Sequence, residues 1–229
     1  MRGTGDVWAV LPVKEIDGAK SRLAPCCSSR FRRALARAML EDVLSALMAA
    51  TGLAGIVVVT ADPDIRTLAI RFGARAWEED ARAGHTQAVM AAARRLAAER
   101  RAAMLTVPAD IPGVTAAEVS RLLAIHGEAP AFTIVPSHDR RGSNAIVVSR
   151  PDAVQLAFGD DSFVSHLGAA RRAGLQPTII PMPGIGLDID RPVDLLRALQ
   201  VPMGARTTEL LVPQRSAFRG RHARTHALT

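Results

Sequence analysis

The chain of 229 residues is poor in aromatic side chains, in cysteine and in long apolar runs. Tyrosine is absent and aromatic residues make up 3% of the chain, so a stacking platform for single-stranded nucleic acid is not expected. The two cysteines, Cys26 and Cys27, are adjacent, which excludes a disulfide framework and a cysteine-rich metal site. No apolar run is long enough to cross a bilayer, and the first one ends at Lys14 without the pattern of a signal peptide. These absences predict a cytoplasmic protein with no membrane partner.

Three common motifs of enzyme active sites are missing as well. The chain has no G-x-x-x-x-G-K-[ST] loop, which excludes a P-loop enzyme. It has no G-x-G-x-x-G after its first apolar run, which argues against a dinucleotide-dependent dehydrogenase. No serine or cysteine lies in a nucleophile elbow. Chemistry on a nucleotide would therefore require another kind of site.

The net charge of +7 is unevenly distributed along the chain. Residues 201–229 carry +4 of it, because they hold five arginines and one acidic residue. A basic terminal segment is typical of a solvated, poorly ordered end. We therefore predict a single domain over residues 1–200 and a basic, disordered tail over residues 201–229 that the protein can lose without losing activity. The charge of the remaining chain is ordinary, so nucleic acid is not expected as a partner.

Lysine occurs only twice, at Lys14 and Lys20, within the stretch L-P-V-K-E-I-D-G-A-K-S-R-L-A-P. The other basic residues of the chain are arginines. The two lysines in one stretch therefore indicate that this position requires a compact ammonium group and not a planar guanidinium group. The stretch follows the apolar run Val7–Val13, which is interpreted as a buried first strand. Open α/β sheets bind ligands at the carboxyl ends of their strands, so Lys14, Lys20 and Arg22 are predicted to direct positive charge at a polyphosphate. A solvated charged loop is the alternative for either lysine alone.

Apolar β-branched runs alternate with segments of helical periodicity along most of the chain. The predicted strands are Val7–Val13, Ile56–Thr60, Ala74–Trp77, Ala103–Val107, Ala131–Val135, Ala145–Ser149 and Thr178–Pro181. The predicted helices run from a cap at Ser28 or Ser29 to about Ala50, from Asp62 to Phe72, from a cap at Thr86 to about Arg100, from a cap at Thr115 to His126, briefly from Pro151, from Ser162 to Arg172 and from Arg191 to Leu199. This alternation predicts an α/β fold with a mainly parallel sheet and helices on both faces.

Three aspartates are candidate metal ligands. Asp110 comes directly after the fourth predicted strand, in V-P-A-D-I-P, where the prolines stiffen the turn that presents it. Asp188 and Asp190 lie in G-L-D-I-D and share one face if the segment is extended. Mg²⁺ is usually held by one or two carboxylates together with substrate phosphates, so a Mg²⁺ site at these three residues is predicted. Helix capping is the alternative for a single aspartate, and Asp190 is placed where it could cap the final helix.

Polar residues also gather at two places in the second half of the chain. Ser143 and Asn144, the only asparagine, lie where a polar loop enters a strand. Gly159 and Ser162 lead into a helix, whose free backbone amides favour an anion. These four residues are predicted to bind a substrate, with helix capping as the alternative for Ser162.

Another helix start carries Gly84, Thr86 and Gln87. These residues are interpreted either as a contact to a nucleotide base or as a helix cap. His85, which lies between them, carries little information by itself.

Taken together, these motifs resemble the guanylyltransferases of deazaflavin coenzyme F-420 biosynthesis, which activate 2-phospho-L-lactate, phosphoenolpyruvate or 3-phosphoglycerate with GTP. The matching pieces run in family order between Val7 and Leu199: P-V-K with A-K-S-R-L, P-A-D-I-P, G-S-N, F-G-D-D-S-F and L-D-I-D. The resemblance implies a Rossmann-like nucleotidyltransferase fold and leaves the segment after Leu199 outside the match.

The resemblance also implies a reaction and a role for each group of residues. An acceptor phosphate oxygen would attack the α-phosphorus of GTP and expel pyrophosphate, with catalysis by positioning and charge neutralisation. The resemblance implies Mg²⁺ at Asp110, Asp188 and Asp190, and the phospho-acid at Ser143, Gly159 and Ser162. From the residues themselves we further predict catalysis by Lys14, Lys20, Arg22 and Asp110, nucleotide binding at Gly84, Thr86 and Gln87, and substrate binding at Asn144. The family usually has Gly-Leu-Asn at the place of Gly84-His85-Thr86. The implied partners are GTP and a small phospho-carboxylic acid, and a homodimer is compatible with the sequence.

Two other classes of protein remain as alternatives. The first alternative is another nucleotidyltransferase or a metal-dependent glycosyltransferase of related fold. In such glycosyltransferases the D-x-D motif usually follows the middle strands, whereas here it lies near the end of the chain. An RNA-binding module is suggested by the isoelectric point near 11.0. The scarcity of aromatic residues and the concentration of charge in the last segment disfavour it.

Overall fold

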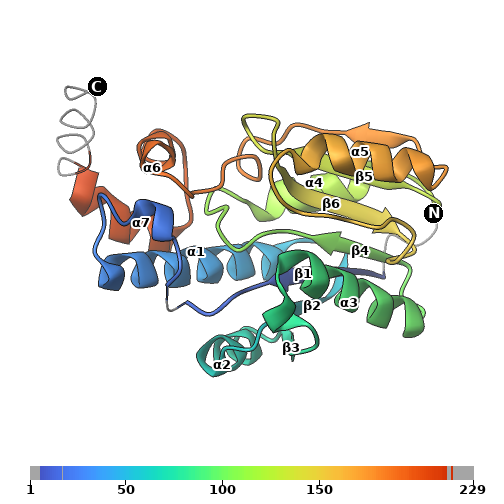
Figure 1. Ribbon diagram of the computed structural model, residues 1–229, viewed down its shortest axis with the longest axis horizontal. Helices are drawn as coiled ribbons and strands as arrows, with labels where there is room; N and C mark the ends of the chain where they lie inside the picture. Colours follow the sequence, from blue (N-terminus) through green and yellow to red (C-terminus); the bar gives the residue numbers. More distant parts are fainter. Residues whose placement is uncertain (1–5, 17, 216–217, 219–229) are drawn as a thin grey trace.

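A computed structural model shows one sheet with helices on both faces (Figure 1). The structure describes residues 6–16, 18–215 and 218. The strands are β1 (Val7–Pro12), β2 (Leu53–Val59), β3 (Arg75–Trp77), β4 (Ala103–Thr106), β5 (Phe132–Pro136), β6 (Ser143–Ser149) and β7 (Pro177–Ile179). The helices are α1 (Ser29–Ala49), α2 (Pro63–Arg71), α3 (His85–Ala98), α4 (Ala116–Ile125), α5 (Ser162–Arg172), α6 (Pro192–Ala198) and α7 (Ala205–Leu211), with short 3-10 turns η1 (Ser21–Leu23), η2 (Ala81–Ala83) and η3 (Val212–Gln214). The predicted α/β class is confirmed.

The sheet is mainly parallel, as predicted, and has the order β3-β2-β1-β4-β6-β5-β7. β6 pairs antiparallel with β4 and β5, and the other neighbouring pairs are parallel. Residues 137–142, which join β5 to β6, are too few for a crossover helix, so the chain returns as a hairpin. The sequence analysis likewise predicted no helix between these two strands. Because β6 runs against β4, its first residue, Ser143, lies at the carboxyl end of β4.

Helix starts follow the polar residues that precede them in the sequence. The side chains of Ser28, Asp62 and Thr115 accept hydrogen bonds from backbone amides in the first turns of α1, α2 and α4. Such caps satisfy amides that have no partner within the helix. Glu118 does not complete a capping box in α4, because its carboxylate accepts a hydrogen bond from Gly184 N at 2.8 Å.

Two apolar cores cover the two faces of the sheet. Alternate residues of β1 point in opposite directions, so Ala9 and Leu11 pack with α1, α2 and α4, whereas Trp8 and Val10 pack with α3 and α5. Ala9, Val10 and Leu11 are completely buried. β1 is thus held from both sides, and the loop that follows it starts from a fixed position.

The segment after Pro151 is not helical, contrary to the prediction. Arg150 has a φ of 58°, and the residues between it and Ser162 form turns and irregular structure. Val154 and Leu156 are buried in the core on the side of α3 and α5. Burying side chains two positions apart favours an extended backbone over a helix.

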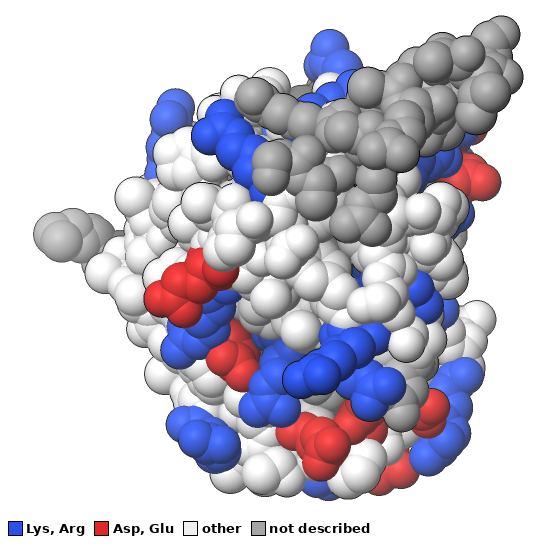
Figure 2. Space-filling view, turned by 90° about the vertical axis from the view of Figure 1, so that its left-hand side faces the viewer, with Lys and Arg blue, Asp and Glu red and all other residues white. Residues whose placement is uncertain are grey.

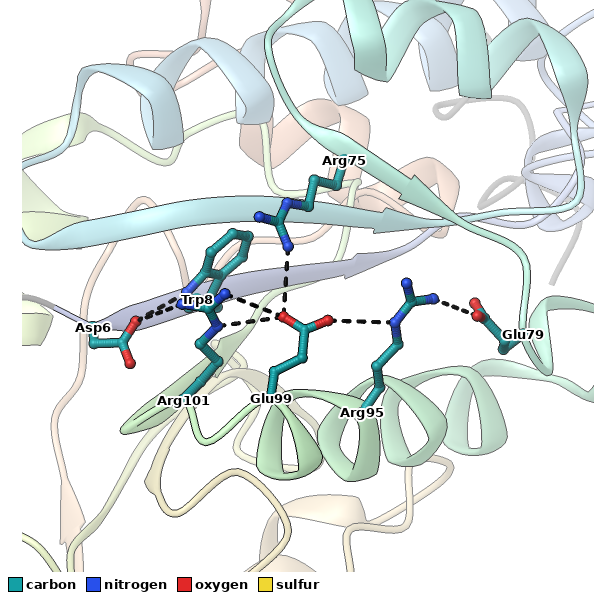
Figure 3. Close-up of polar contacts among 7 residues, drawn as sticks. All are labelled: Asp6, Trp8, Arg75, Glu79, Arg95, Glu99 and Arg101. Atoms are coloured by element: carbon teal, nitrogen blue, oxygen red, sulfur yellow. Dashed lines mark hydrogen bonds and ion pairs between the residues drawn. The ribbon is translucent and has the colours of Figure 1, made fainter.

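A network of charged side chains fastens the amino-terminal ends of the strands (Figure 3). The guanidinium groups of Arg75 and Arg101 lie 4.3 and 4.8 Å from the ring centroid of Trp8. Glu99, at the end of α3, pairs with both arginines at 3.5 and 3.3 Å. Gly55 on β2 is required beside this ring, because a Cβ there would lie 2.5 Å from a ring carbon of Trp8. This network stabilises the sheet at the end opposite the loop that holds the two lysines.

The predicted disordered tail over residues 201–229 is wrong for its first half. Helix α7 packs beside α1, and Leu211 and Phe218 are buried. Both side chains belong to a third apolar cluster that includes Leu35 and Met39 of α1. The folded unit therefore extends past residue 200, and residues 216–217 and 219–229 of the predicted tail lie outside the described residues.

Asp42 of α1 anchors α7. Its buried carboxylate accepts hydrogen bonds from the backbone amides of Arg206 at 3.2 Å and Thr207 at 2.8 Å. These amides start α7, where a negative charge stabilises the positive end of the helix. Arg206 also forms an ion pair with Glu41 at 2.8 Å, so this arginine of the predicted tail has an acidic partner on the body of the protein.

Surface charge is mixed on the face shown in Figure 2, where lysine and arginine side chains border aspartate and glutamate. Individual arginines of the domain have acidic partners, as with Arg37 and Glu41 at 2.9 Å and Arg66 and Glu78 at 2.7 Å. A continuous basic stripe is the usual footprint of nucleic-acid binding, and this face does not carry one. None of the helices described has both the length and the apolar character required to cross a membrane.

Removing α7 should destabilise the protein. We expect Leu211→Ala to lower the free energy of unfolding by about 2–5 kcal/mol, because it leaves a cavity at a fully buried position. A chain ending at Gln200 should lose more, since it also uncovers Asp42 and the apolar face of α1. Urea unfolding followed by circular dichroism measures both effects. Val212→Ala, at an exposed position of the same segment, is the control and should stay within about 0.5 kcal/mol of the parent protein. Equal midpoints for the shortened and full-length chains would contradict the packing of α7.

Acid should weaken the fold through the partly buried His126. The ring nitrogens of His126 bond to Thr133 Oγ1 at 2.9 Å and Ser149 Oγ at 2.8 Å, and burial lowers its pKa from 6.5 to about 4. Between these pH values the unfolded state binds more protons than the folded state, so the free energy of unfolding falls as the pH drops from 6.5 towards 4 and is constant in this respect above 6.5. Unfolding midpoints measured across this range should show a shallower slope for His126→Phe. An unchanged slope would exclude His126 as a source of the effect.

Candidate active site

A cavity of about 800 Å³ lies where β1 and β4 end. Its walls include Lys14, Lys20, Arg22, Asp110 and Asp190, which the sequence predicted as catalytic or metal-binding residues. The carboxyl ends of parallel strands are the usual place for ligands in this class of fold. The structure therefore brings the loop after β1, the turn after β4 and the segment before α6 to one site.

Lys20 is the centre of the polar contacts in this cavity. Its Nζ lies 2.5 Å from Asp110 Oδ2 and 2.7 Å from Asp190 Oδ1, and the side chain is 9% exposed. Burial lowers the pKa of Lys20, but the two carboxylates raise it by more, so the net pKa lies above its ordinary value and the ammonium stays charged. Its backbone has a φ of 55°, in the left-handed region, and such a conformation in a residue other than glycine costs on the order of 1 kcal/mol. Strain of this kind clusters at functional sites.

Two further cations lie at the rim. The side chain of Arg22 is 62% exposed and its Nη1 lies 3.6 Å from Asp190 Oδ2. Lys14 is exposed and lines the same cavity. One buried and two exposed cations suit a polyphosphate, whose charge extends over several groups.

The three predicted metal ligands do not form a preassembled cluster. In the part of the chain that the structure describes, no group of three or more acidic, histidine or cysteine side chains could hold a metal ion. The ammonium of Lys20 bridges Asp110 and Asp190. Asp188 still fits a cation, because burial and repulsion from Asp110 raise its pKa, which indicates that positive charge is lacking there. Mg²⁺ needs only one or two carboxylates when phosphates complete its shell, so Asp110 and Asp188 suffice.

A second cavity, of about 160 Å³, adjoins the first. The two cavities share His85, Pro108 and Asp110 in their walls. The four residues predicted to bind a substrate all line the smaller cavity: Ser143, Asn144, Gly159 and Ser162. The site thus has a larger and a smaller chamber that meet at Asp110.

Asn144 forms a hydrogen bond to the carboxylate of Asp188. Its Nδ2 donates hydrogen bonds to Ile185 O at 3.0 Å and to Asp188 Oδ1 at 3.1 Å. Both amide hydrogens are therefore used within the protein. Asn144 therefore positions the carboxylate of Asp188 through its Nδ2. Because Asn144 also lines the smaller chamber, its direct contact to substrate stays a prediction.

Ser143 contacts a residue that the sequence analysis did not identify. Its Oγ lies 3.0 Å from Nδ1 of His166, which is completely buried in α5. His166 follows Ser162 by four positions, so the two side chains share one face of the helix. That spacing was the signal in the sequence that could have linked His166 to the site.

The residues predicted to bind the nucleotide are only partly at the cavity. Gly84 lines the larger chamber and has a φ of 106°, which favours glycine. Thr86 does not cap α3, because the helix already begins at His85, and its hydroxyl accepts a hydrogen bond from Phe158 N at 2.9 Å. Gln87 is exposed and is not among the residues that line either chamber.

His85 lies at the junction of the two chambers. Burial lowers its pKa to about 4, an effect that the nearby Asp110 opposes and Lys14 reinforces, so the imidazole is neutral near pH 7. Its ring centroid lies 4.5 Å from that of Phe158. A neutral imidazole can donate or accept a hydrogen bond there without adding charge.

The third apolar cluster supports the walls of the larger chamber. Leu187 and Ile189, which alternate with Asp188 and Asp190, are buried in this cluster. Leu23, at the end of the loop that holds the lysines, belongs to it as well. Because α7 contributes Leu211 to the same cluster, the segment after residue 200 supports the site as well as the fold.

Comparison with known proteins establishes the family. A family model described as "Guanylyl transferase CofC like" matches residues 7–223. The chain belongs to this guanylyltransferase family. It is 38% identical to the phosphoenolpyruvate guanylyltransferase of Rubrobacter xylanophilus, over 83% of this chain and 92% of that protein. It is 35% identical to the 3-phospho-D-glycerate guanylyltransferase of Colwellia psychrerythraea, over 81% of this chain and 88% of that protein. The predicted nucleotidyltransferase class of enzyme is confirmed, whereas the expectation that the match ends at Leu199 is wrong.

Solved structures confirm the Rossmann-like nucleotidyltransferase fold. A Desulfovibrio desulfuricans protein assigned as a nucleotide-diphospho-sugar transferase has a TM-score of 0.74 and 18% identity, and the likeness covers 95% of this chain and 98% of that one. A nucleotidyl transferase from Methanothermobacter thermautotroptrophicus has a TM-score of 0.59 and 16% identity, covering 84% and 95%. At these identities the comparison supports the fold, and the family assignment supports the type of reaction.

Replacing Asp110 should abolish guanylyl transfer while the protein stays folded. Asp110→Asn removes the carboxylate at the junction of the chambers and should lose several kcal/mol of charge stabilisation in the transition state, a rate loss of about a thousandfold or more. Pyrophosphate release at saturating GTP measures this effect. Glu15→Gln is the matched control, since Glu15 lines the same chamber but is exposed and pairs only with Arg82 in the described contacts, at 3.3 Å. Near-normal turnover of folded Asp110→Asn would remove Asp110 from the mechanism.

Proposed function

We propose that the protein transfers GMP from GTP to a small phosphorylated carboxylic acid and releases pyrophosphate, as a step of coenzyme F-420 biosynthesis. The pair of joined chambers is the observation that supports this proposal. The larger chamber has four cationic side chains in its walls, Lys14, Lys20, Arg22 and Arg82, and suits the nucleotide triphosphate. The smaller one, with its two serine hydroxyls, suits the acid. A cytoplasmic location and association as a homodimer stay predictions.

The charged residues of the larger chamber act on the triphosphate. Lys14, Lys20 and Arg22 neutralise its phosphates and follow the charge that moves onto the departing pyrophosphate. Mg²⁺, held by Asp110 and Asp188, would offset the negative charge of the phosphates around the reacting phosphorus. Asp190 keeps the buried Lys20 ionised and in place.

The smaller chamber holds the attacking group. The acceptor phosphate is already ionised near neutral pH, so its oxygen needs no general base to attack the α-phosphorus. Ser143 and Ser162 orient that phosphate and its carboxylate through their hydroxyl groups. The first two amides of α5 do not take part, because those of Ser162 and Phe163 donate to Gly159 O and Arg141 O. Placing the two reactants on either side of Asp110 turns the reaction into one within a single complex.

We propose phosphoenolpyruvate as the acceptor. The relatives from Rubrobacter xylanophilus and Conexibacter woesei, each 38% identical to this chain, are named phosphoenolpyruvate guanylyltransferases. The smaller chamber is compact, and Val107, Pro108 and Phe158 line part of it, which suits a short acid without a free hydroxyl group. The name of the Colwellia relative makes 3-phosphoglycerate the second candidate.

Incubation with GTP, Mg²⁺ and one acid at a time tests the proposal. Phosphoenolpyruvate, 3-phosphoglycerate and 2-phospho-L-lactate are the three acids, and pyrophosphate release and the mass of the product are measured. We expect a guanylylated acid, with the highest kcat/KM for phosphoenolpyruvate. ATP and CTP in place of GTP test the choice of base. A separate incubation with a nucleotide sugar in place of GTP tests the glycosyltransferase alternative. Consumption of the nucleotide sugar without pyrophosphate release would favour that alternative.

The two chambers should respond differently to mutation. Ser162→Ala should raise the KM of the acceptor about 5- to 30-fold, as expected for the loss of one hydrogen bond to a charged group, and change the KM of GTP little. Lys20→Ala should act mainly on the use of GTP. Ser165→Ala is the control for α5, because Ser165 is exposed and its hydroxyl bonds to Asp161 O. The opposite pattern in steady-state kinetics would mean that the two substrates are assigned to the wrong chambers.

A further inference from the structure

His166 is a polar side chain with no access to solvent. It lies in α5 behind the smaller chamber and is completely buried. Both ring nitrogens have partners: Nδ1 lies 3.0 Å from Ser143 Oγ, and Nε2 lies 3.1 Å from Ala157 N. A buried imidazole bonded at both nitrogens is fixed in position as well as in orientation.

The partner at Nε2 decides which nitrogen carries the proton. The backbone N–H of Ala157 can only donate, so Nε2 must accept and carries no hydrogen. The proton of the neutral ring is therefore on Nδ1. The doubly protonated form would direct an N–H at another N–H, and burial, together with the nearby His85, lowers the pKa of His166 to about 4, in agreement with a neutral ring.

This tautomer determines the role of Ser143. Because Nδ1 of His166 donates, Ser143 Oγ accepts, and the hydroxyl hydrogen of Ser143 points to another partner. Among the described residues, the only hydrogen-bond partner of Ser143 Oγ is His166 Nδ1, so this hydrogen has no acceptor from the protein. Ser143 is 9% exposed and lines the smaller chamber, so the hydrogen is available to a molecule bound there.

We propose that His166 is a positioning residue that holds the Ser143 hydroxyl as a hydrogen-bond donor to an anionic oxygen of the acceptor. The inference rests on the proposed function, since it assigns the smaller chamber to the phospho-acid. A hydroxyl held in this way favours a phosphate or carboxylate oxygen, which only accepts, over a group that itself donates. The chamber gains selectivity for an anion without a charged residue at this position.

Phe158 keeps the imidazole plane in place. Its ring centroid lies 4.8 Å from that of His166, edge to face, and 4.5 Å from that of His85. Ala157, which supplies the amide to Nε2, is the preceding residue. The loop between β6 and α5 thus fixes both the orientation and the tautomer of His166.

Three substitutions separate positioning from simple packing. His166→Phe keeps a ring beside Phe158 and removes both hydrogen bonds. His166→Gln places its amide near the position of Nε2, where its oxygen can accept from Ala157, and leaves Ser143 without a donor. His166→Asn places its amide near the position of Nδ1, so it can still donate to Ser143.

We expect the KM of phosphoenolpyruvate to rise about tenfold in His166→Phe and His166→Gln, which corresponds to about 1.4 kcal/mol. His166→Asn should recover most of this loss, and the KM of GTP should change less than about twofold in all three. If His166 served only for packing, asparagine would not restore the KM of phosphoenolpyruvate better than glutamine does. Equal loss in all three variants, or an equal rise in both KM values, would overturn the proposal.

A double-mutant cycle with Ser143→Ala tests whether His166 acts through Ser143. Once the hydroxyl is gone, His166→Phe should add little to the KM of the acceptor, whereas additive effects would refute the coupling. His126→Phe is the matched control, because His126 also bonds two partners through its ring but is not a lining residue of either chamber. It should lower the melting temperature and leave both KM values unchanged.

Failure of the parent protein to guanylylate any phospho-acid would contradict the proposed function, whereas an active parent with unaffected His166 variants would contradict this inference alone.

Discussion

The ammonium of Lys20, held between Asp110 and Asp190, is the interaction on which the site depends. A buried ammonium without a partner costs several kcal/mol, so Lys20, whose side chain is 9% exposed, depends on the two more exposed carboxylates to stay in place. They come from the loop after β1, the turn after β4 and the segment before α6. The pairing therefore sets the distance between three loops, and with it the shape of the larger chamber.

Apolar side chains next to these charged residues hold their backbone segments in place. Leu23, Leu187 and Ile189 lie beside the charged residues in the sequence and are buried in the third cluster. Leu211 of α7 completes that cluster, and Asp42 holds α7 on α1 through two backbone amides. The segment after residue 200 thus bears on catalysis through the position of the loops, although no residue of it lines either chamber in the described part of the chain.

The smaller chamber works by a different principle. Asp110 and Asp188 bring carboxylates to its wall, and its other polar side chains are neutral. Neighbours fix the direction of these neutral groups: His166 that of Ser143, and the amide of Ala157 that of His166. Asn144 similarly orients Asp188 from the side of this chamber. Neutral groups with fixed direction select an anion by geometry, and the charge at the junction of the chambers comes from Lys20 and the carboxylates.

Periodicity, caps and short motifs determined the fold class, most element positions and the residues that meet at the ends of β1 and β4, because these depend on neighbours in the sequence. Tertiary structure alone decided the rest. The amide of Asn144 turns to Asp188, the ring of His166 bonds to Ser143, and α7 folds against Asp42, because each depends on a partner far away in the chain. A basic composition after residue 200 indicates an exposed end, but the few apolar residues there outweigh it once α1 presents a surface on which they can be buried.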